Sequence, residues 1–155
     1  MMYILKPLTQ TQAEEIAYKW HYDGDYSFYD MEADQEDLLE FLDPVQRGES
    51  YYAVFDEYQM IGFFSFAQKN DHTIDIGLGM RPENTGEGNG EAFVHAGIEF
   101  AKRTYRPTHI TLSVATFNRR AIKVYENIGF QIEETFMQPT NGSYFEFVRM
   151  VYECE

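Results

Sequence analysis

The sequence has few cations, a single cysteine and no long apolar run. Its 155 residues include 12 Lys and Arg against 26 Asp and Glu, which gives a formal charge of −14. Nucleic-acid backbones and anionic membrane surfaces bind clustered Lys and Arg, so this balance argues against both as partners. The lone Cys154 excludes an internal disulfide and a thiolate metal cluster.

Long apolar segments are also missing. The longest stretch without Asp, Glu, Lys or Arg covers residues 107–118, twelve residues, whereas a membrane-spanning helix needs about 20. The opening residues, MMYILKPLTQ, turn polar too early for a secretory signal. We therefore expect a cytoplasmic chain. No linker, repeat or low-complexity tract interrupts it, so we expect residues 1–155 to form one domain.

The negative charge is concentrated toward the N-terminus. Residues 1–58 hold three Lys and Arg and 14 Asp and Glu, and residues 23–43 hold nine carboxylates with no Lys, Arg or His. Such a block is most often a solvated surface that keeps a protein in solution. The alternative is a negative rim that concentrates a cationic substrate. The sequence leaves both interpretations open and favours the first.

What the sequence does have is a regular succession of strand and helix patterns. Strands are expected near residues 3–8, 50–56, 60–68, 73–80, 109–115, 130–137 and 144–152. Helices are expected over residues 9–20, from residue 34 to about 43, and over residues 118–129. Another helix is expected to follow from the segment 81–94 and to end near residue 103. Residues 21–31 should form a loop and residues 138–143 a hairpin turn. This order predicts an α+β fold, a mixed and mostly antiparallel sheet of about seven strands flanked by about four helices.

The segment TIDIGLGM at residues 73–80 alternates strictly. One face carries apolar side chains, Ile74, Ile76, Leu78 and Met80. The other carries a carboxylate and two glycines, Asp75, Gly77 and Gly79. Glycine weakens a strand and often lets another group approach the backbone closely. A bulge or a crowded helix contact would explain the glycines equally well.

Three glycines, Gly86, Gly88 and Gly90, alternate between this strand and the next helix. Such a turn can direct several backbone N–H groups to one point, and the helix dipole adds positive charge there. This is the physics of a phosphate or pyrophosphate site, although glycines also form ordinary turns. The spacing fits neither a P-loop, which needs Lys followed by Ser or Thr, nor the dinucleotide motif G-x-G-x-x-G.

Two motifs together resemble the GNAT superfamily, the acyl-coenzyme A-dependent N-acyltransferases. Arg81-Pro82 followed by GEGNG at residues 86–90 is similar to the family's R/Q-x-x-G-x-G/A pyrophosphate loop. Residues 118–130, NRRAIKVYENIGF, are similar to its second signature, N-x-x-A-x-x-x-Y-x-x-x-G-F. The resemblance covers nearly the whole chain, and it implies the GNAT fold and acetyl-coenzyme A (acetyl-CoA) as cosubstrate.

The resemblance also implies site residues. Tyr125 would be the general acid toward the coenzyme A sulfur, and Asp75 a candidate base, a substrate ligand or a structural residue. The cofactor would contact the backbone at Leu78, Gly79 and Met80, then Gly86, Glu87, Gly88, Asn89, Gly90, Glu91, Asn118 and Arg120. The acceptor pocket would include Tyr26, Phe28, Tyr29 and Tyr144, with Phe136 nearby. Without the flanking motif, Tyr125 would read as a core aromatic.

Some positions depart from the family pattern. Thr85 stands where Arg or Gln is usual, and carboxylates at Glu87 and Glu91 repel a pyrophosphate by about 1 kcal/mol each if solvated at close range. Three basic residues in the second motif either compensate for this repulsion or merely form a solvated helix face: Arg119, Arg120 and Lys123. His21, His72, His95 and His109 lack metal-ligand spacing, so no metal is expected.

The sequence thus predicts an N-acetyltransferase that moves an acetyl group from acetyl-CoA to a primary amine by direct attack in a ternary complex. The acceptor would be a small molecule or peptide, a cationic one being one option, and the protein a monomer or homodimer. The alternative is a non-catalytic acyl-CoA-binding or sensing domain.

Overall fold

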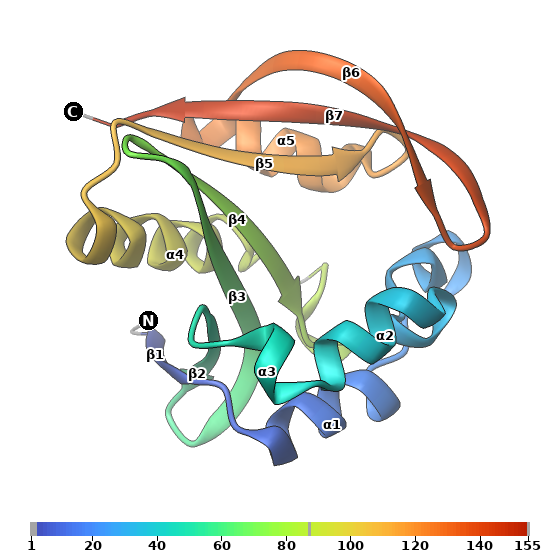
Figure 1. Cartoon of the computed structure of the whole chain (residues 1–155). Helices are drawn as coiled ribbons and strands as arrows, with labels where there is room; N and C mark the ends of the chain where they lie inside the picture. Colours follow the sequence, from blue (N-terminus) through green and yellow to red (C-terminus); the bar gives the residue numbers. More distant parts are fainter. Residues whose placement is uncertain (1–2, 87, 155) are drawn as a thin grey trace.

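The computed structural model describes residues 3–86 and 88–154 (Figure 1). Its strands are β1 (Tyr3–Pro7), β2 (Tyr51–Asp56), β3 (Gln59–Asn70), β4 (Thr73–Met80), β5 (His109–Ala115), β6 (Gln131–Thr140) and β7 (Ser143–Glu153). Its α-helices are α1 (Gln10–Lys19), α2 (Gln35–Leu42), α3 (Pro44–Arg47), α4 (Gly90–Tyr105) and α5 (Arg119–Ile128). The connections contain the 3-10 helices η1 (Gly24–Tyr29), η2 (Met31–Ala33) and η3 (Pro82–Asn84).

The seven strands form one sheet in the order β1-β2-β3-β4-β5-β7-β6. Neighbouring strands run antiparallel except β4 and β5, which are parallel and pair only where Thr73–Asp75 faces His109–Thr111. Beyond that point the two strands separate, and the sheet opens into two arms (Figure 1). The mixed, mostly antiparallel sheet predicted from the sequence is confirmed, and the gap between β4 and β5 is what positions the site.

Three helices begin directly after a side chain that caps them. Thr9 and Gln12 form a complete capping box at α1, Asp34 caps α2 by accepting the Asp37 N–H, and Asn118 caps α5 by accepting the Ala121 N–H. These side chains satisfy N–H groups that the first helical turn leaves without partners. The α-helices within the described residues number five rather than about four, because Pro44 begins an additional short turn, α3.

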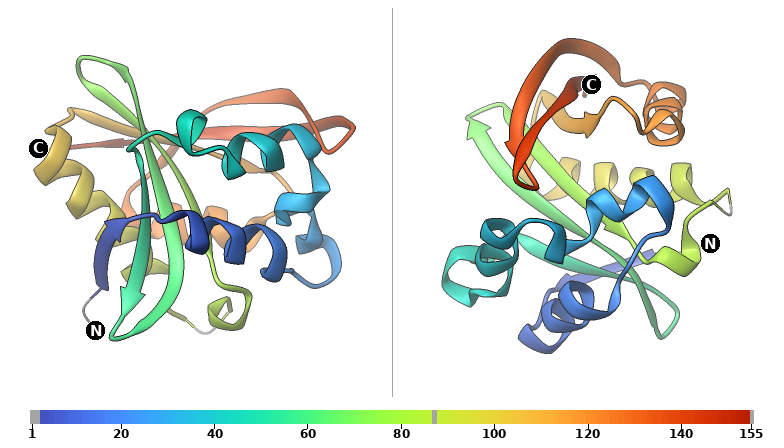
Figure 2. Two further views of the ribbon diagram at one scale, coloured as in Figure 1. Left: turned by 60° about the horizontal axis from the view of Figure 1, so that its bottom comes forward. Right: turned by 90° about the vertical axis from the view of Figure 1, so that its right-hand side faces the viewer.

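Helices cover both faces of the sheet (Figure 2). Successive residues of one strand alternate between the two cores: Val54 and Phe64 pack with α4 and α5, whereas Ala53 and Phe63 pack with α1 and α2. The first core contains residues of both arms, such as Phe64 and Met150, whereas the strand residues of the second come from β2 and β3. The shared core therefore joins the two arms although β4 and β5 do not pair along their full length.

The glycine face of β4 is crowded by its neighbouring strand. A methyl group at Gly79 would lie 2.4 Å from the Phe63 ring, and one at Gly77 would lie 2.5 Å from Ser65 Oγ. Both neighbours belong to β3. These glycines therefore reflect close packing within the sheet, and neither a bulge nor a helix contact explains them.

Two expected connections differ from the sequence-based prediction. Residues 21–31 were expected to be a loop, but η1 and the start of η2 lie there. The turn expected over residues 138–143 is shorter, because β6 and β7 continue to Thr140 and Ser143 and only Asn141 and Gly142 remain between them. Both have positive φ, 50° and 79°, as a two-residue hairpin turn of type I′ requires. In the described part of the chain, no helix is long and apolar enough to cross a membrane.

Candidate active site

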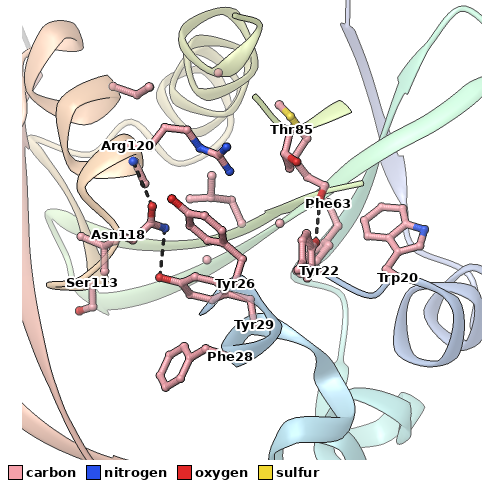
Figure 3. A pocket seen from close by; sticks show the side chains of 18 of the residues that line it. Trp20, Tyr22, Tyr26, Phe28, Tyr29, Phe63, Thr85, Ser113, Asn118 and Arg120 are labelled. Carbon is pink, nitrogen blue, oxygen red and sulfur yellow. Dashed lines mark hydrogen bonds between the residues drawn. The ribbon is translucent and has the colours of Figure 1, made fainter. Parts of the chain in front are cut away.

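A cavity of about 670 Å³ runs through the gap between the two arms of the sheet (Figure 3). Its walls come from β4, from Ser113 and Val114 on β5, and from the N-terminal turns of α4 and α5. Opposite them lie α1, α2 and η1, with Gln138 and Thr140 of β6 and Asn141 of the turn closing one end. The cavity thus joins the glycine turn to the acidic N-terminal segment, as a site for two substrates requires.

The glycine turn forms one end of the cavity. Gly86, Gly88 and Gly90 all line it, as does Glu91 in the first turn of α4. Gly86 and Gly88 have φ of +74° and +81°, a conformation that glycine adopts without strain. Asn89, the N-cap residue of α4, is not among the lining residues, and Glu87 lies outside the described residues.

Arg120 connects this turn to the opposite wall. A methyl group at Gly86 would lie 3.1 Å from Arg120 Nη1, so the guanidinium lies directly against the glycine turn. The guanidinium carbon also lies 4.6 Å from the centroid of the Tyr26 ring, a cation–π contact. Arg120 therefore adds side-chain charge to the anion-binding potential of the backbone (Figure 3).

The end of β4 forms the floor between the two ends. Leu78, Gly79 and Met80 line the cavity, and this part of β4 has no partner from β5 within the described chain. Its backbone groups on that side are free to bind a ligand. The Met80 carbonyl is not, because the Tyr22 hydroxyl donates to it at 2.6 Å.

Tyr125 of α5 is one of the residues that line the cavity. The residue is 7% exposed, and burial, with a smaller contribution from Tyr29, raises the pKa of its phenol above the ordinary value. A phenol in this environment keeps its proton at neutral pH and can donate a hydrogen bond to a ligand in the cavity.

Asn118 links α5 to the N-terminal segment. Its Oδ1 accepts the Ala121 N–H at 3.2 Å, and its Nδ2 donates to the Tyr29 hydroxyl at 3.1 Å. Both bonds are drawn in Figure 3. The residue that begins α5 therefore also fixes η1 against the cavity.

The segment containing η1 and η2 is held on the β6–β7 hairpin. Thr140 Oγ1 and the Asn141 N–H both donate to Asp34 Oδ2, and Asn141 Nδ2 donates to the Phe28 carbonyl at 3.0 Å. The Phe28 ring packs edge-on against Phe145 with centroids 4.8 Å apart. These contacts join residues that are more than 100 positions apart in the sequence. They close the end of the cavity that contains the predicted acceptor residues, called the acceptor end from here on.

The predicted acceptor residues fall into two groups. Tyr26, Phe28 and Tyr29 line the cavity. Tyr144 does not, because it lies at the start of β7 beside the turn and is 69% exposed. Phe136 stacks on Phe147, and of these two it is Phe147 that lines the cavity.

Three carboxylates line the acceptor end, and two already have partners. Asp30 accepts from the Tyr22 N–H at 2.8 Å and faces His21 Nδ1 at 3.0 Å. Asp34 is the helix cap and hairpin contact described above, and these backbone hydrogen bonds lower its pKa. Asp37 accepts no hydrogen bond from residues 3–86 or 88–154. Asp37 is an exposed residue, but partial desolvation at the cavity wall, and secondarily the carboxylates of Asp34, Glu40 and Glu36, raise its pKa.

Asp75 lies apart from these groups. Its Oδ1 accepts the Thr111 hydroxyl proton at 2.7 Å, where β4 and β5 are still paired. It is not among the residues that line the cavity. Its position therefore favours the structural role over that of a base in contact with substrate.

Sequence reasoning missed several lining residues. The most important are Trp20, Tyr22, Asp37, Ser113, Gln138 and Phe147. Most of them lie on helices or strands whose residue pattern indicated which side chains are buried, but not which of those side chains face a cavity. Tyr22 was recognisable as one aromatic among many in residues 21–31, but its partner 58 positions away was not.

In the portion of the chain that the structure describes, no three His, Cys, Asp or Glu side chains are arranged to hold a metal ion.

Comparisons with known proteins place this geometry in context. Residues 3–131 match the family model described as "Acetyltransferase (GNAT) domain". Acetyltransferase PseH of Campylobacter jejuni is 28% identical over 134 residues, which cover 83% of this chain and 84% of that protein.

Solved structures share the fold across almost the whole chain. A GNAT-family acetyltransferase from Bacillus anthracis has a TM-score of 0.76 at 17% identity, covering 99% of this chain and 95% of the other. Spermidine N-acetyltransferase from Vibrio cholerae, solved with CoA and spermine, has a TM-score of 0.75 at 20% identity, covering 97% and 95%. Campylobacter jejuni N-acetyltransferase PseH has a TM-score of 0.67 at 21% identity, covering all of both chains.

Proposed function

Because this chain belongs to the GNAT acetyltransferase family, we propose that it transfers an acetyl group from acetyl-CoA to a primary amine by direct attack in a ternary complex. The observation that carries the proposal is the continuous cavity with the buried Tyr125 in its wall, between the glycine turn and the acidic end. An acyltransferase of this kind needs an anion site, a proton donor and an acceptor compartment in one connected space.

The residues at the glycine end fit the diphosphate of a coenzyme A. Gly86 leaves open the space that a Cβ would fill, and Arg120 Nη1 lies beside that space. The N-terminus of α4 adds partial positive charge. Glu91 opposes an anion here, so we expect the backbone N–H groups and Arg120 to contribute most of the affinity.

Tyr125 supplies the proton that the leaving group requires. As the amine nitrogen bonds to the thioester carbon, the C–S bond breaks with its electron pair on sulfur. The Tyr125 hydroxyl is neutral in its buried position and can protonate that sulfur. The amine must attack unprotonated, and solvent in the open acceptor end can take its proton.

The acceptor compartment favours a cationic amine with an apolar portion. The unpaired carboxylate of Asp37 shares it with Trp20, Met31 and Phe63. A carboxylate attracts an ammonium group, and aromatic faces stabilise cations and bury hydrocarbon. The V. cholerae relative was solved with spermine, a cationic amine, which agrees in chemistry with this choice.

The test is coenzyme A release from acetyl-CoA with a panel of di- and polyamines, aminosugars and N-terminal peptides. We expect acetylation of at least one cationic amine and a loss of about 10²- to 10³-fold in kcat for Tyr125→Phe. Tyr144→Phe, outside the cavity, is the matched control and should keep wild-type activity. Tight acetyl-CoA binding without turnover of any amine would favour a non-catalytic acyl-CoA-binding domain instead.

A further inference from the structure

The Tyr29 hydroxyl oxygen accepts a hydrogen bond from Asn118, whereas its own proton has no acceptor among the described residues. Asn118 Nδ2 donates to this oxygen at 3.1 Å, and Asn118 cannot offer its Oδ1 instead because that atom caps α5. With the Asn118 amide donating to its oxygen, the hydroxyl must direct its own proton elsewhere.

The cavity is where that proton can find an acceptor. Tyr29 is a lining residue, and in residues 3–86 and 88–154 no carbonyl or carboxylate accepts from it. Burial is the largest cause that raises the pKa of Tyr29, so the group remains a donor at neutral pH. Hydrogen bonds received by a hydroxyl oxygen also strengthen the bond that its proton makes.

The position of Tyr125 shows which part of a ligand this proton would meet. Tyr125 follows Asn118 by seven residues, about two helical turns, so the two share a face of α5. Helical side chains lean toward the N-terminus, which directs the Tyr125 phenol toward Asn118 and Tyr29. Both phenols line the same cavity.

We propose that Tyr29 is a second catalytic residue whose hydroxyl donates a hydrogen bond to the carbonyl oxygen of the bound acyl thioester. The inference rests on the proposed function. A thioester presents two atoms near Tyr125, a sulfur that accepts hydrogen bonds weakly and a carbonyl oxygen that accepts them well. If Tyr125 serves the sulfur, the carbonyl oxygen is the partner for Tyr29.

The two phenols then act at successive stages. The amine lone pair forms the C–N bond while the carbonyl π pair moves to oxygen, and Tyr29 stabilises the resulting negative charge. The oxyanion reforms the C=O bond as the C–S pair leaves on sulfur, which takes the Tyr125 proton. Nitrogen releases its proton to solvent, and solvent returns one to Tyr125.

The experiment compares Tyr29→Phe with Tyr18→Phe, a matched loss of one phenol oxygen at a residue that is 51% exposed and does not line the cavity. For Tyr29→Phe we expect kcat to fall about a hundredfold, as for loss of one oxyanion donor, with KM for acetyl-CoA unchanged. Tyr18→Phe should retain kcat. Isotope-edited infrared spectra of bound [1-¹³C-acetyl]-CoA provide a readout that needs no turnover. The carbonyl band should lie lower in wild type than in Tyr29→Phe.

The outcomes separate this inference from the proposed function. A Tyr29-dependent carbonyl band without turnover of any amine would support the hydrogen bond to the carbonyl oxygen but reject the transferase, and with it a catalytic role for that bond. Turnover with an unchanged band and kcat in Tyr29→Phe would reject the inference alone, and absence of acetyl-CoA binding would reject both. If Tyr29→Phe fails to fold, 3-fluorotyrosine at position 29 replaces it. As a more acidic donor it should lower the band further, and no shift would overturn the proposal.

Discussion

The Tyr22 hydroxyl donates a 2.6 Å hydrogen bond to the Met80 carbonyl oxygen, which lies at the end of β4 and 58 positions away in the sequence. Burial raises the pKa of Tyr22, so this donor stays protonated at physiological pH. The bond ties the start of the acidic segment to the strand that ends at the glycine turn. The two ends of the cavity are thus connected through one phenol.

Removing that phenol oxygen should destabilise the fold. Tyr22→Phe leaves the partly buried Met80 carbonyl without its partner, and we expect the free energy of unfolding to fall by about 1–2 kcal/mol. Urea denaturation measures this, with Tyr58→Phe as the control because Tyr58 is 99% exposed. Equal stabilities for the two variants would show that the Tyr22 bond contributes nothing.

The glycine turn can be tested with a pair of matched glycines. Gly86 and Gly48 both have positive φ, +74° and +59°, so alanine strains the backbone at both, by about 1–3 kcal/mol. Only Gly86 lines the cavity, where a methyl group would meet Arg120.

We expect Gly86→Ala to weaken coenzyme A binding by about tenfold or more, as for loss of a charge-assisted hydrogen bond. Gly48→Ala should leave it unchanged. Titration calorimetry gives both dissociation constants. Similar losses of affinity in both variants would mean that strain, and not the turn itself, is responsible.

Asp37 should determine the preference for cationic acceptors. Asp37→Asn removes the unpaired carboxylate from the cavity, and we expect KM for a cationic amine to rise about tenfold, while KM for an uncharged amine changes little. Glu36→Gln is the control, because Glu36 lies on the same turn of α2 but does not line the cavity. A KM that rises equally for both kinds of amine would contradict this role.

His21 should make the stability of the acidic segment depend on pH. Its Nδ1 faces Asp30 Oδ2 at 3.0 Å and its Nε2 faces the Tyr18 carbonyl at 2.9 Å. Both partners are acceptors, so only the imidazolium can donate to both. The hydrogen bond to Asp30 is the largest cause that raises the pKa of His21, and Glu32 adds to it.

Because the pKa of His21 is higher in the folded than in the unfolded protein, protonated His21 stabilises the fold. This stabilisation is fully present at a pH below the unfolded-state pKa of about 6.5, and it is lost as the pH rises through the folded-state pKa. We therefore expect wild type to be more stable than His21→Gln at pH 5 and the difference to shrink toward alkaline pH. Thermal unfolding of both across this range is the measurement. A difference that is constant or grows with pH would refute the pairing.

Local patterns predicted the elements well because local chemistry forms them. The Thr9 capping box, the Asn118 cap and the alternation in residues 73–80 each report a hydrogen bond or burial pattern within a few residues. The order of these elements then predicted a mixed, mostly antiparallel sheet of about seven strands, which the structure confirms. The order of the strands within that sheet was not predicted. The additional turn α3 was missed because four residues are too few to show periodicity.

The acceptor end was only partly predictable. Tyr26, Phe28 and Tyr29, which were expected at the acceptor pocket, line the cavity, whereas Tyr144, which was also expected there, lies outside it. The hairpin turn is tighter than the turn residues suggested, so that Tyr144 begins a strand instead of extending a loop. Asp37 resembled eight other carboxylates in residues 23–43. What distinguishes it, its place in the cavity wall and its lack of a partner, depends on contacts between distant segments.

The most direct test of the whole account is a crystal structure of the protein with acetyl-CoA. We predict that the diphosphate contacts the backbone N–H groups between Gly86 and Gly90 with Arg120 beside it. The thioester should lie between β4 and β5 with its carbonyl oxygen at Tyr29 and its sulfur at Tyr125. A cofactor bound elsewhere, or with its thioester away from both phenols, would contradict the site described for this protein.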